Sequence, residues 1–385
     1  MKVMMVDPWG TYNMYMYTNG LCESIADYID LSLWTNYYYP KERALKYPVK
    51  RIFFKRSEYM KQGYPRNLIR LCEYYSGYFA LIRELQQNKY DLVHIQWLLH
   101  YKSDIRFLTK IKKLCPKIVY TAHNVLPHRS GEKSCRDLKK IYSIVDAVLV
   151  HGEGVKEEFA SQFADYIHKV EVQRHGPFTD QDLTYDTRTI EKKVLDKLQH
   201  YERVSIYFGN IFFNKGVDRL LRIWLEVFKN NRKHLLIIAG KKSGPYKELE
   251  ELERDIIACD NILYIDHFIE NNLLNFLVSQ SQIVLLPYRH ASMSGVIFTA
   301  AEFNKPVLST KTGAIREYLL DGENSFLTEN RDDHFSRALQ HISENVSKET
   351  LALMGLKLHK HIRQNFSWEE IGKKLVDTVY NNTLL

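Results

Sequence analysis

The stretch from residue 286 to 306, LPYRHASMSGVIFTAAEFNKP, combines a serine-glycine pair at a predicted helix start with a lone acid two turns later. If Ser294 caps this helix, the backbone N–H groups of Gly295 and Val296 stay free at the positive end of the helix dipole. Because serine has a small side chain and glycine has none, a phosphate can approach the backbone closely at this helix start. Glu302 lies on the same face, about 10 Å farther along at about 1.5 Å per residue. That distance suits a carboxylate that binds the ribose hydroxyls of the same nucleotide.

Two cations could neutralise such a diphosphate. Lys215 lies at the start of another predicted helix, and Arg289 lies shortly before the serine-glycine pair. The alternative is a capped helix in which Glu302 forms an ion pair with Lys305 or with an arginine nearby. Each residue alone favours that structural interpretation, whereas the whole set favours a nucleoside diphosphate.

The elements that would position these residues alternate along the chain, with apolar strand-like runs followed by helical periodicity. Strands are predicted at 2–7, 91–96, 117–122, 147–152, 169–173, 203–209, 234–240, 261–265, 282–288 and 306–310. Helices are predicted near 18–30, 66–88, 102–114, 134–144, 153–165, 215–230, 246–258, 270–279 and 294–303, with more to the end. Such alternation implies parallel sheets built from right-handed βαβ units.

The alternation restarts after a polar stretch near residues 175–200. The predicted fold class is therefore α/β, with two doubly wound, Rossmann-like domains that face a cleft. In such sheets, ligands bind beyond the carboxyl ends of the strands. The candidate polar residues that follow a predicted strand within a few positions are His123, Asn210, Lys215 and Arg289.

Composition places the chain among globular proteins. Its 385 residues exceed one compact core and suit two domains, and 45% of them are hydrophobic and 26% charged. No apolar run reaches the roughly 18–20 residues of a membrane span, and the start, MKVMMVDPWG, is predicted to be a buried strand instead of a secretory signal. Five scattered cysteines, none in a CxxC pair, are typical of reduced thiols, so a cytoplasmic location is expected.

Positive charge concentrates in residues 41–70, where ten lysines and arginines stand against two glutamates, an excess equal to the +8 of the whole chain. With interleaved aromatic residues, such a segment suits an anionic lipid surface, to which each nearby cation contributes about 1 kcal/mol. The segment also suits RNA or single-stranded DNA, although no RNP-like or helix-turn-helix pattern accompanies it. A third possibility is that it is a solvated surface loop around a short strand. The residues predicted to bind an acceptor or a membrane are Lys50, Arg51, Phe53, Phe54, Lys55 and Arg56.

The second half of the chain resembles the donor domain of the GT-B glycosyltransferases, in particular glycosyltransferase family 4. YFGNIFFNKGVDRLL resembles that family's glycine, lysine-glycine pair and helix, and the run from NILYIDHF to GENSFL follows its nucleotide-sugar signature. YTAHNVLPH resembles the acceptor-domain loop with the family's histidine, and VQRHGPF its pre-linker turn. FSWEEIGKKLVDTVY resembles the closing helix, which in this fold crosses back to the first domain. The resemblance implies an acceptor domain at 1–178, a donor domain at 179–365 and a closing helix at 366–385.

The resemblance also implies roles for single residues. Glu302 matches the second acid of the family's paired-glutamate motif, which binds the ribose, and Lys215 matches the lysine on the donor diphosphate. His123 matches the histidine near the transferring sugar. The residues that match the segments holding the sugar and phosphate, or passing the base, are Ser294, Gly295, Val296, His267 and Phe268.

Two positions depart from the family pattern. Ser294 stands where the first acid of the glutamate pair is usual, so the contacts to the donor sugar change. Asn210 stands where an arginine usually follows the strand glycine, and we expect Arg289 to supply the missing charge.

Together these features predict transfer of a sugar from a nucleoside-diphosphate sugar to an acceptor hydroxyl. The expected acceptor is a lipid-linked or growing glycan of polysaccharide or glycolipid biosynthesis, reached at the inner face of the membrane, and no nucleic-acid partner is expected. No DxD-like pair follows a strand end, so neither a metal nor another cofactor is expected, and the resemblance implies retention of the anomeric configuration. The alternatives are a sugar-nucleotide epimerase of the same fold, a non-catalytic partner subunit and a nucleic-acid binder.

Overall fold

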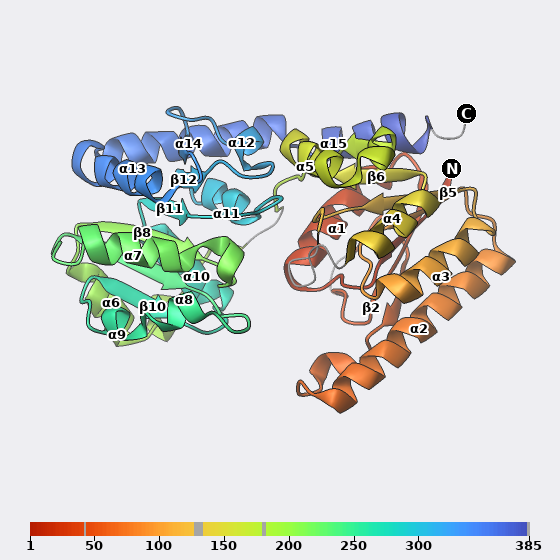
Figure 1. Ribbon diagram of the computed structural model, residues 1–385, viewed down its shortest axis with the longest axis horizontal. Coiled ribbons are helices and arrows are strands. Elements are labelled where there is room, and N and C mark those ends of the chain that lie inside the picture. The colour runs from red at the N-terminus through yellow and green to blue at the C-terminus, as the bar shows by residue number, and fades with distance from the viewer. Residues whose placement is uncertain (42–43, 127–133, 179–181, 383–385) are drawn as a thin grey trace. The chain divides into compact units, whose positions relative to one another are not determined.

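The computed structural model describes residues 1–41, 44–126, 134–178 and 182–382 (Figure 1). The chain divides into two compact units. The first is Met1–Thr179 together with Phe366–Leu385, and the second is Asp180–Asn365. Each unit is a parallel sheet with helices between most successive strands, which confirms the predicted α/β class with two doubly wound sheets.

Seven described strands form the sheet of the first unit, in the order β3-β2-β1-β4-β5-β6-β7. Every pair of neighbours in it is parallel. The central strands are buried on both faces, which is why their sequences are nearly continuous apolar runs. The strands are β1 (Lys2–Asp7), β2 (Asp30–Asn36), β3 (Val49–Phe53), β4 (Leu92–Ile95), β5 (Lys117–Thr121), β6 (Ala147–Val150) and β7 (Val170–Val172).

Helices connect these strands, and a segment from the far end of the chain joins them. The last helix, α15 (Trp368–Leu375), packs against the first helix and continues as one π-helical turn at Val376–Tyr380. The connecting helices are α1 (Tyr12–Ile25), α2 (Tyr64–Gln87), α3 (Tyr101–Lys112), α4 (Cys135–Ile144) and α5 (Glu153–Phe163).

Trp368 anchors the closing helix to the first unit. Its indole lies where a side chain on Gly20 of α1 would overlap it, and its Nε1–H donates a hydrogen bond of 2.6 Å to the carbonyl oxygen of Pro177. At the other end of the segment, the Tyr380 hydroxyl lies 2.6 Å from Nδ1 of His94 on β4. The closing helix therefore contacts the first unit, as the sequence predicts, and completes its core.

Six described strands form the sheet of the second unit, in the order β10-β9-β8-β11-β12-β13, and all pairs are parallel. The strands are β8 (Arg203–Phe208), β9 (His234–Ala239), β10 (Ile262–Ile265), β11 (Ile283–Leu286), β12 (Val307–Thr310) and β13 (Ser325–Thr328). The helices are α6 (Lys192–Gln199), α7 (Val217–Val227), α8 (Lys247–Glu250), α9 (Glu253–Ile257), α10 (Asn271–Gln280), α11 (Val296–Glu302), α12 (Ile315–Tyr318), α13 (Asp332–Asn345) and α14 (Lys348–Asn365).

The strand order reverses between β1 and β4 in the first sheet and between β8 and β11 in the second. At such a point the connections from two neighbouring strands run to opposite sides, and the carboxyl ends of those strands are where open α/β sheets bind ligands. A ligand is therefore expected beside the residues that follow β1, β4, β8 and β11.

Several elements differ from the prediction. The helix predicted near 18–30 runs from Tyr12 to Ile25, because the apolar residues after it belong to β2, a buried strand paired with β1. β13, four residues long, is also absent from the predicted strands. The helix predicted at 246–258 is divided into α8 and α9. In the described chain, no helix combines the length and apolarity needed to cross a bilayer.

Truncating Trp368 tests the anchor. Trp368→Ala should lower the free energy of unfolding by about 3–5 kcal/mol, because the buried indole is replaced by a cavity. Urea unfolding followed by circular dichroism measures this as a lower midpoint. Leu356→Ala, on an exposed part of α14, is the control, with an expected change within about 0.5 kcal/mol. Equal midpoints for Trp368→Ala and the native protein would contradict the anchoring role.

Candidate functional site

The loops after β8 and β11 meet where the order of the second sheet reverses. The carbonyl oxygen of Asn214, in the first loop, accepts hydrogen bonds from the backbone N–H groups of Arg289 and His290, at 2.8 and 3.2 Å. Gly216 has a φ of +67°, and a Cβ there would overlap the carbonyl oxygen of Pro287. Glycine at this position therefore allows the two loops to approach each other closely.

Lys215 is half-buried beside these contacts. Its Nζ lies 3.8 Å from the centroid of the Tyr288 ring, a cation–π distance. No carboxylate of the described chain lies within ion-pair distance of this ammonium group, and burial lowers the pKa of Lys215 to about 8. A cation that has lost part of its hydration and has no acid partner favours an anionic ligand.

The start of α11 differs from the prediction. Gly295 occupies the cap position, with φ and ψ of −61° and −18°, and the helix begins at Val296. The predicted capping role of Ser294 is wrong, because its buried hydroxyl lies 2.9 Å from the Tyr288 hydroxyl and caps nothing. The backbone N–H groups of Gly295 and Val296 donate to no acceptor in the described chain.

Tyr288 joins these two features. Its ring meets the Lys215 ammonium, and its hydroxyl meets Ser294, the residue before the uncapped N–H groups. Gly209, exposed at the end of β8, adds no side chain, and the nearest atom to where its Cβ would lie is a methyl of Val296 at 3.8 Å. An anion could therefore contact the ammonium and the backbone N–H groups with little obstruction from side chains.

Arg289 is not the free cation that the sequence predicts. Its guanidinium forms a two-bond ion pair with Asp218 of α7, at 2.6 and 2.8 Å, and lies over the Phe213 ring at 4.3 Å. Although burial opposes it, hydrogen bonds from Arg289 and Tyr246 hold the pKa of Asp218 below its usual value. Because Asp218 already balances its charge, the ion pair argues against the expected role of Arg289 in neutralising phosphates, and that role stays a prediction.

Glu302, the last residue of α11, is nearly buried and forms an ion pair. Its Oε2 accepts a hydrogen bond of 2.8 Å from Arg363 of α14, whereas the alternative partner, Lys305, donates to the carbonyl oxygen of Ser279. Oε1 of Glu302 accepts no hydrogen bond from a described residue. Because a carboxylate accepts about four hydrogen bonds, the ion pair leaves capacity for a ligand.

Three further predicted residues follow strands of the same sheet. Asn210 is exposed after β8, and its carbonyl oxygen accepts a hydrogen bond of 2.8 Å from the Tyr207 hydroxyl. His267 and Phe268 are exposed after β10, with 66% of Phe268 accessible. An aromatic side chain left this accessible suits stacking on a flat ligand.

In the first unit, His123 follows β5 and takes part in a chain of hydrogen bonds. Nδ1 of His151 lies 3.2 Å from the carbonyl oxygen of Gln173 and must donate to it, so Nε2 of His151 accepts from Nδ1 of His123 at 2.9 Å. Nε2 of His123 is then a lone-pair acceptor, and it is buried without a partner in the described chain. Burial, with His151 and other histidines nearby, holds the pKa of His123 well below its usual value, so the ring is neutral.

Two tryptophans beside His123 are functional candidates that sequence reasoning missed. Trp97, after β4, stacks on the His123 ring with centroids 4.2 Å apart and an interplanar angle of 4°. Trp9, after β1, meets Trp97 edge to face at 5.6 Å and is 43% exposed. Both follow the strands between which the first sheet reverses its order, and that position is the signal by which they could have been found.

Residues 202–345 match the protein family described as "Glycosyl transferases group 1". This match lies within the second unit and supports the resemblance of that unit to the group 1 glycosyltransferases. A glycosyltransferase of Methanocaldococcus jannaschii, itself uncharacterised, is 21% identical to it over 304 residues, which cover 75% of each chain. The GDP-mannose:glycolipid 4-beta-D-mannosyltransferase of Xanthomonas campestris is 25% identical over 271 residues, covering 64% of this chain and 71% of that one. The motif resemblance is thereby confirmed at the level of a nucleotide-sugar-dependent glycosyltransferase.

The solved structure of Anabaena HepE in complex with UDP is similar to this chain over its whole length. The TM-score is 0.69 at 15% identity, with 99% of this chain and 100% of HepE covered. At this identity the likeness shows the fold, and it confirms the predicted GT-B fold.

One predicted surface of the glycosyltransferase is wrong in part. Phe53 and Phe54 are fully buried and pack against Tyr74 of α2, so they cannot enter a membrane. Arg51 donates hydrogen bonds to the carbonyl oxygens of Tyr39 and Pro40. The exposed cations that stay predicted to bind an acceptor or an anionic membrane are Lys50, Lys55 and Arg56.

No group of three or more histidine, cysteine, aspartate or glutamate side chains that could hold a metal ion occurs among the described residues.

The lowered pKa of Lys215 makes its binding of a diphosphate sensitive to pH. The ammonium is charged below a pKa of about 8 and neutral above it, so UDP affinity should fall as pH rises past that value, by up to about tenfold per pH unit. Isothermal calorimetry from about pH 7 to 9.5 measures the fall. In Lys215→Arg the charge persists, and affinity should stay flat. The same decline in both proteins would show that another group titrates.

Proposed function

We propose that the protein transfers a sugar from a nucleoside-diphosphate sugar to a hydroxyl of an acceptor glycan, with the donor diphosphate held by Lys215. The observation that carries this proposal is the half-buried Lys215 ammonium, which has an aromatic neighbour but no carboxylate partner in the described chain. The hydroxyl of the same tyrosine contacts Ser294, the residue before the unbonded N–H groups of Gly295 and Val296. A diphosphate supplies the negative charge and the acceptor oxygens that these groups lack.

The same groups account for catalysis of the departure step. When the bond between sugar and diphosphate breaks, negative charge grows on the leaving oxygen. A fixed ammonium and fixed N–H groups stabilise that charge more than they stabilise the bound donor, which lowers the barrier. As the new glycosidic bond forms, the proton of the acceptor hydroxyl would pass to an oxygen of the departing diphosphate, and we propose retention of configuration at the sugar carbon.

Glu302 and Phe268 would hold the nucleoside. Oε1 of Glu302 is the free acceptor for the ribose hydroxyls, while Arg363 keeps the carboxylate in place through Oε2. The exposed ring of Phe268 would lie against the base. Both UDP and GDP donors occur among similar proteins, since HepE was solved with UDP and the mannosyltransferase uses GDP-mannose.

His123 would contact the sugar without taking a proton. Its Nε2 is an acceptor buried without a partner, and a sugar hydroxyl can donate to it. Because the pKa of His123 lies well below its usual value, the ring is a weak base at neutral pH. The expected acceptor is a lipid-linked or growing glycan, which the likeness to a glycolipid mannosyltransferase supports.

Replacing Glu302 tests the ribose contact. Glu302→Gln should lower the affinity for UDP about tenfold, because the amide is a weaker acceptor, and should change the affinity for 2′-deoxy-UDP much less. Calorimetry compares the two ligands. Arg363→Ala is the matched control, since it breaks the ion pair but leaves the carboxylate, and its UDP affinity should fall less. Equal losses for both nucleotides in Glu302→Gln would make Glu302 a structural ion-pair residue.

Replacing His123 tests the function itself. The assay follows labelled sugar from a panel of UDP- and GDP-sugars into a membrane fraction that supplies the acceptor. His123→Ala should slow transfer about tenfold or more, because one hydrogen bond to the sugar is lost. The affinity for UDP should stay within about twofold of the native value. His168→Ala, an exposed histidine of the same unit, should transfer at the native rate. Release of a free, altered sugar without any acceptor would instead indicate an epimerase.

A further inference from the structure

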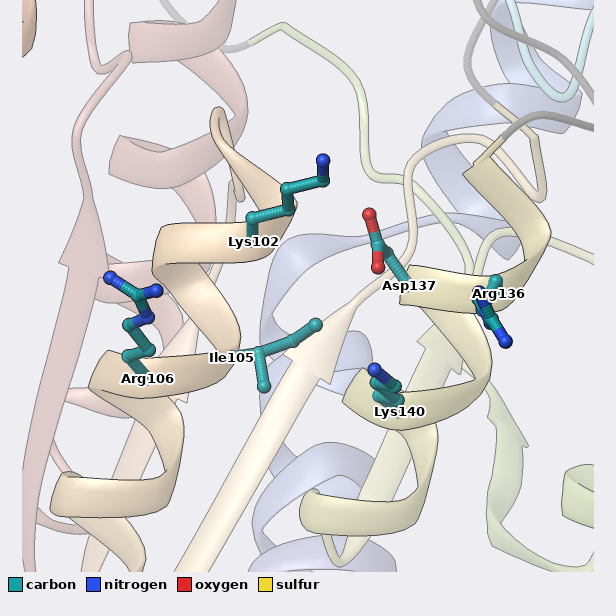
Figure 2. A pocket seen from close by; sticks show the side chains of 6 residues that line it. All are labelled: Lys102, Ile105, Arg106, Arg136, Asp137 and Lys140. Carbon is teal, nitrogen blue, oxygen red and sulfur yellow. The ribbon is translucent and has the colours of Figure 1, made fainter.

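A positively charged groove lies between α3 and α4 of the first unit (Figure 2). Its volume is about 520 Å³, within the range of about 300–1,000 Å³ that small-molecule sites occupy. The residues that line it are Lys102, Ile105 and Arg106 from α3, and Arg136, Asp137 and Lys140 from α4.

The groove lies at the substrate-binding end of the unit. α3 follows β4, and α4 is the next helix after β5, so both helices run away from the carboxyl edge of the sheet. Lys102 and Arg136 are each the second residue of their helix and therefore lie near that edge. Trp97 and His123 follow the same two strands. The groove is thus built on the two connections that carry the candidate sugar-binding residues.

The four cations of the groove lack acid partners. None of them forms an ion pair with a described residue, although α3 pairs another lysine, Lys112, with Asp146 at 2.6 Å. On each helix the two cations are four residues apart, a spacing at which like charges repel and destabilise the helix. With Asp137 as the one acid of the lining, the six lining residues carry a net charge of +3, although Arg106 and Arg136 lie on the outer sides of the two helices. An anion in the groove would relieve this repulsion.

The arrangement of the side chains suits a ligand that carries hydroxyl groups as well as negative charge. Figure 2 shows Lys102, Ile105 and Asp137 pointing into the space between the helices, with Arg106 and Arg136 on the outer sides. A carboxylate accepts hydrogen bonds only, so Asp137 suits a ligand with hydroxyl groups. The cations suit phosphate oxygens. A phosphorylated sugar offers both kinds of group on one small molecule.

We propose that this groove binds the phosphate of a phosphorylated carbohydrate acceptor, with Asp137 on a sugar hydroxyl. The inference rests on the proposed transfer to a glycan and adds the chemical class of the acceptor. A lipid-linked sugar diphosphate and a free sugar phosphate share this chemistry, and the experiment separates them.

The experiment begins with UDP, added until calorimetry shows that the donor site is full. Glucose 6-phosphate, inorganic phosphate and glucose are then titrated into that complex. Glucose 6-phosphate should bind more tightly than phosphate, and glucose should not bind measurably. Lys102→Ala/Lys140→Ala, which removes one cation from each helix, should weaken glucose 6-phosphate binding about five- to tenfold and leave UDP affinity unchanged.

The matched control removes the same charge outside the groove, from the C-cap of α3 and from α4. Lys113→Ala/Lys139→Ala changes two exposed lysines that do not line it, and should bind glucose 6-phosphate like the native protein. No binding of glucose 6-phosphate to the UDP complex, or equal weakening in both double variants, would overturn the proposal. Failure of UDP to bind the native protein would instead overturn the proposed function.

A last arm identifies the source of the phosphate. Geranyl diphosphate carries the phosphates on a lipid chain. Binding of geranyl diphosphate tighter than that of glucose 6-phosphate, and lost in Lys102→Ala/Lys140→Ala, supports a lipid-linked acceptor. The reverse order, with the same loss, supports a soluble sugar phosphate.

Discussion

The backbone contact between the loops after β8 and β11 is the constraint on which the donor site depends. One carbonyl oxygen, that of Asn214, accepts two N–H groups from the other loop, and Gly216 removes the side chain that would hold the loops apart. Since main-chain atoms make this contact, it uses neither the ammonium of Lys215 nor the N–H groups at the start of α11. The polar groups that face a ligand are thereby kept separate from those that hold the loops in place.

Two cations in this region show how burial and partners decide function. Arg289 has a carboxylate, an aromatic ring and a carbonyl oxygen around its guanidinium, so its charge is fully balanced within the protein. Lys215 has only aromatic rings beside its ammonium among the described residues, and the loss of hydration lowers its pKa. Sequence position made the two look equivalent. The difference arises from Asp218, on α7, which pairs with the arginine and not with the lysine.

The sequence predicts what depends on local periodicity and misses what depends on distant partners. The alternation of strands and helices, the strand-end positions of His123 and Lys215 and the contact of the closing helix with the first unit follow from pattern and motif. The capping role of Ser294 fails because a tyrosine six residues earlier takes its hydroxyl. The exposure of Phe53 fails because α2, later in the chain, covers β3. Neither partner can be chosen from a single sequence, since many tyrosines and helices were available.

The burial of Trp368 in the first unit has a consequence for synthesis of the chain. The ribosome completes the strands of that unit first, then makes Asp180–Asn365, and only then the helix that closes the first core. At about 5–20 residues per second, the nascent first unit waits on the order of ten to forty seconds with the surface beneath α15 uncovered. The second unit can finish folding in that interval. Completion of the first-made core is therefore conditional on prior translation of the whole second unit.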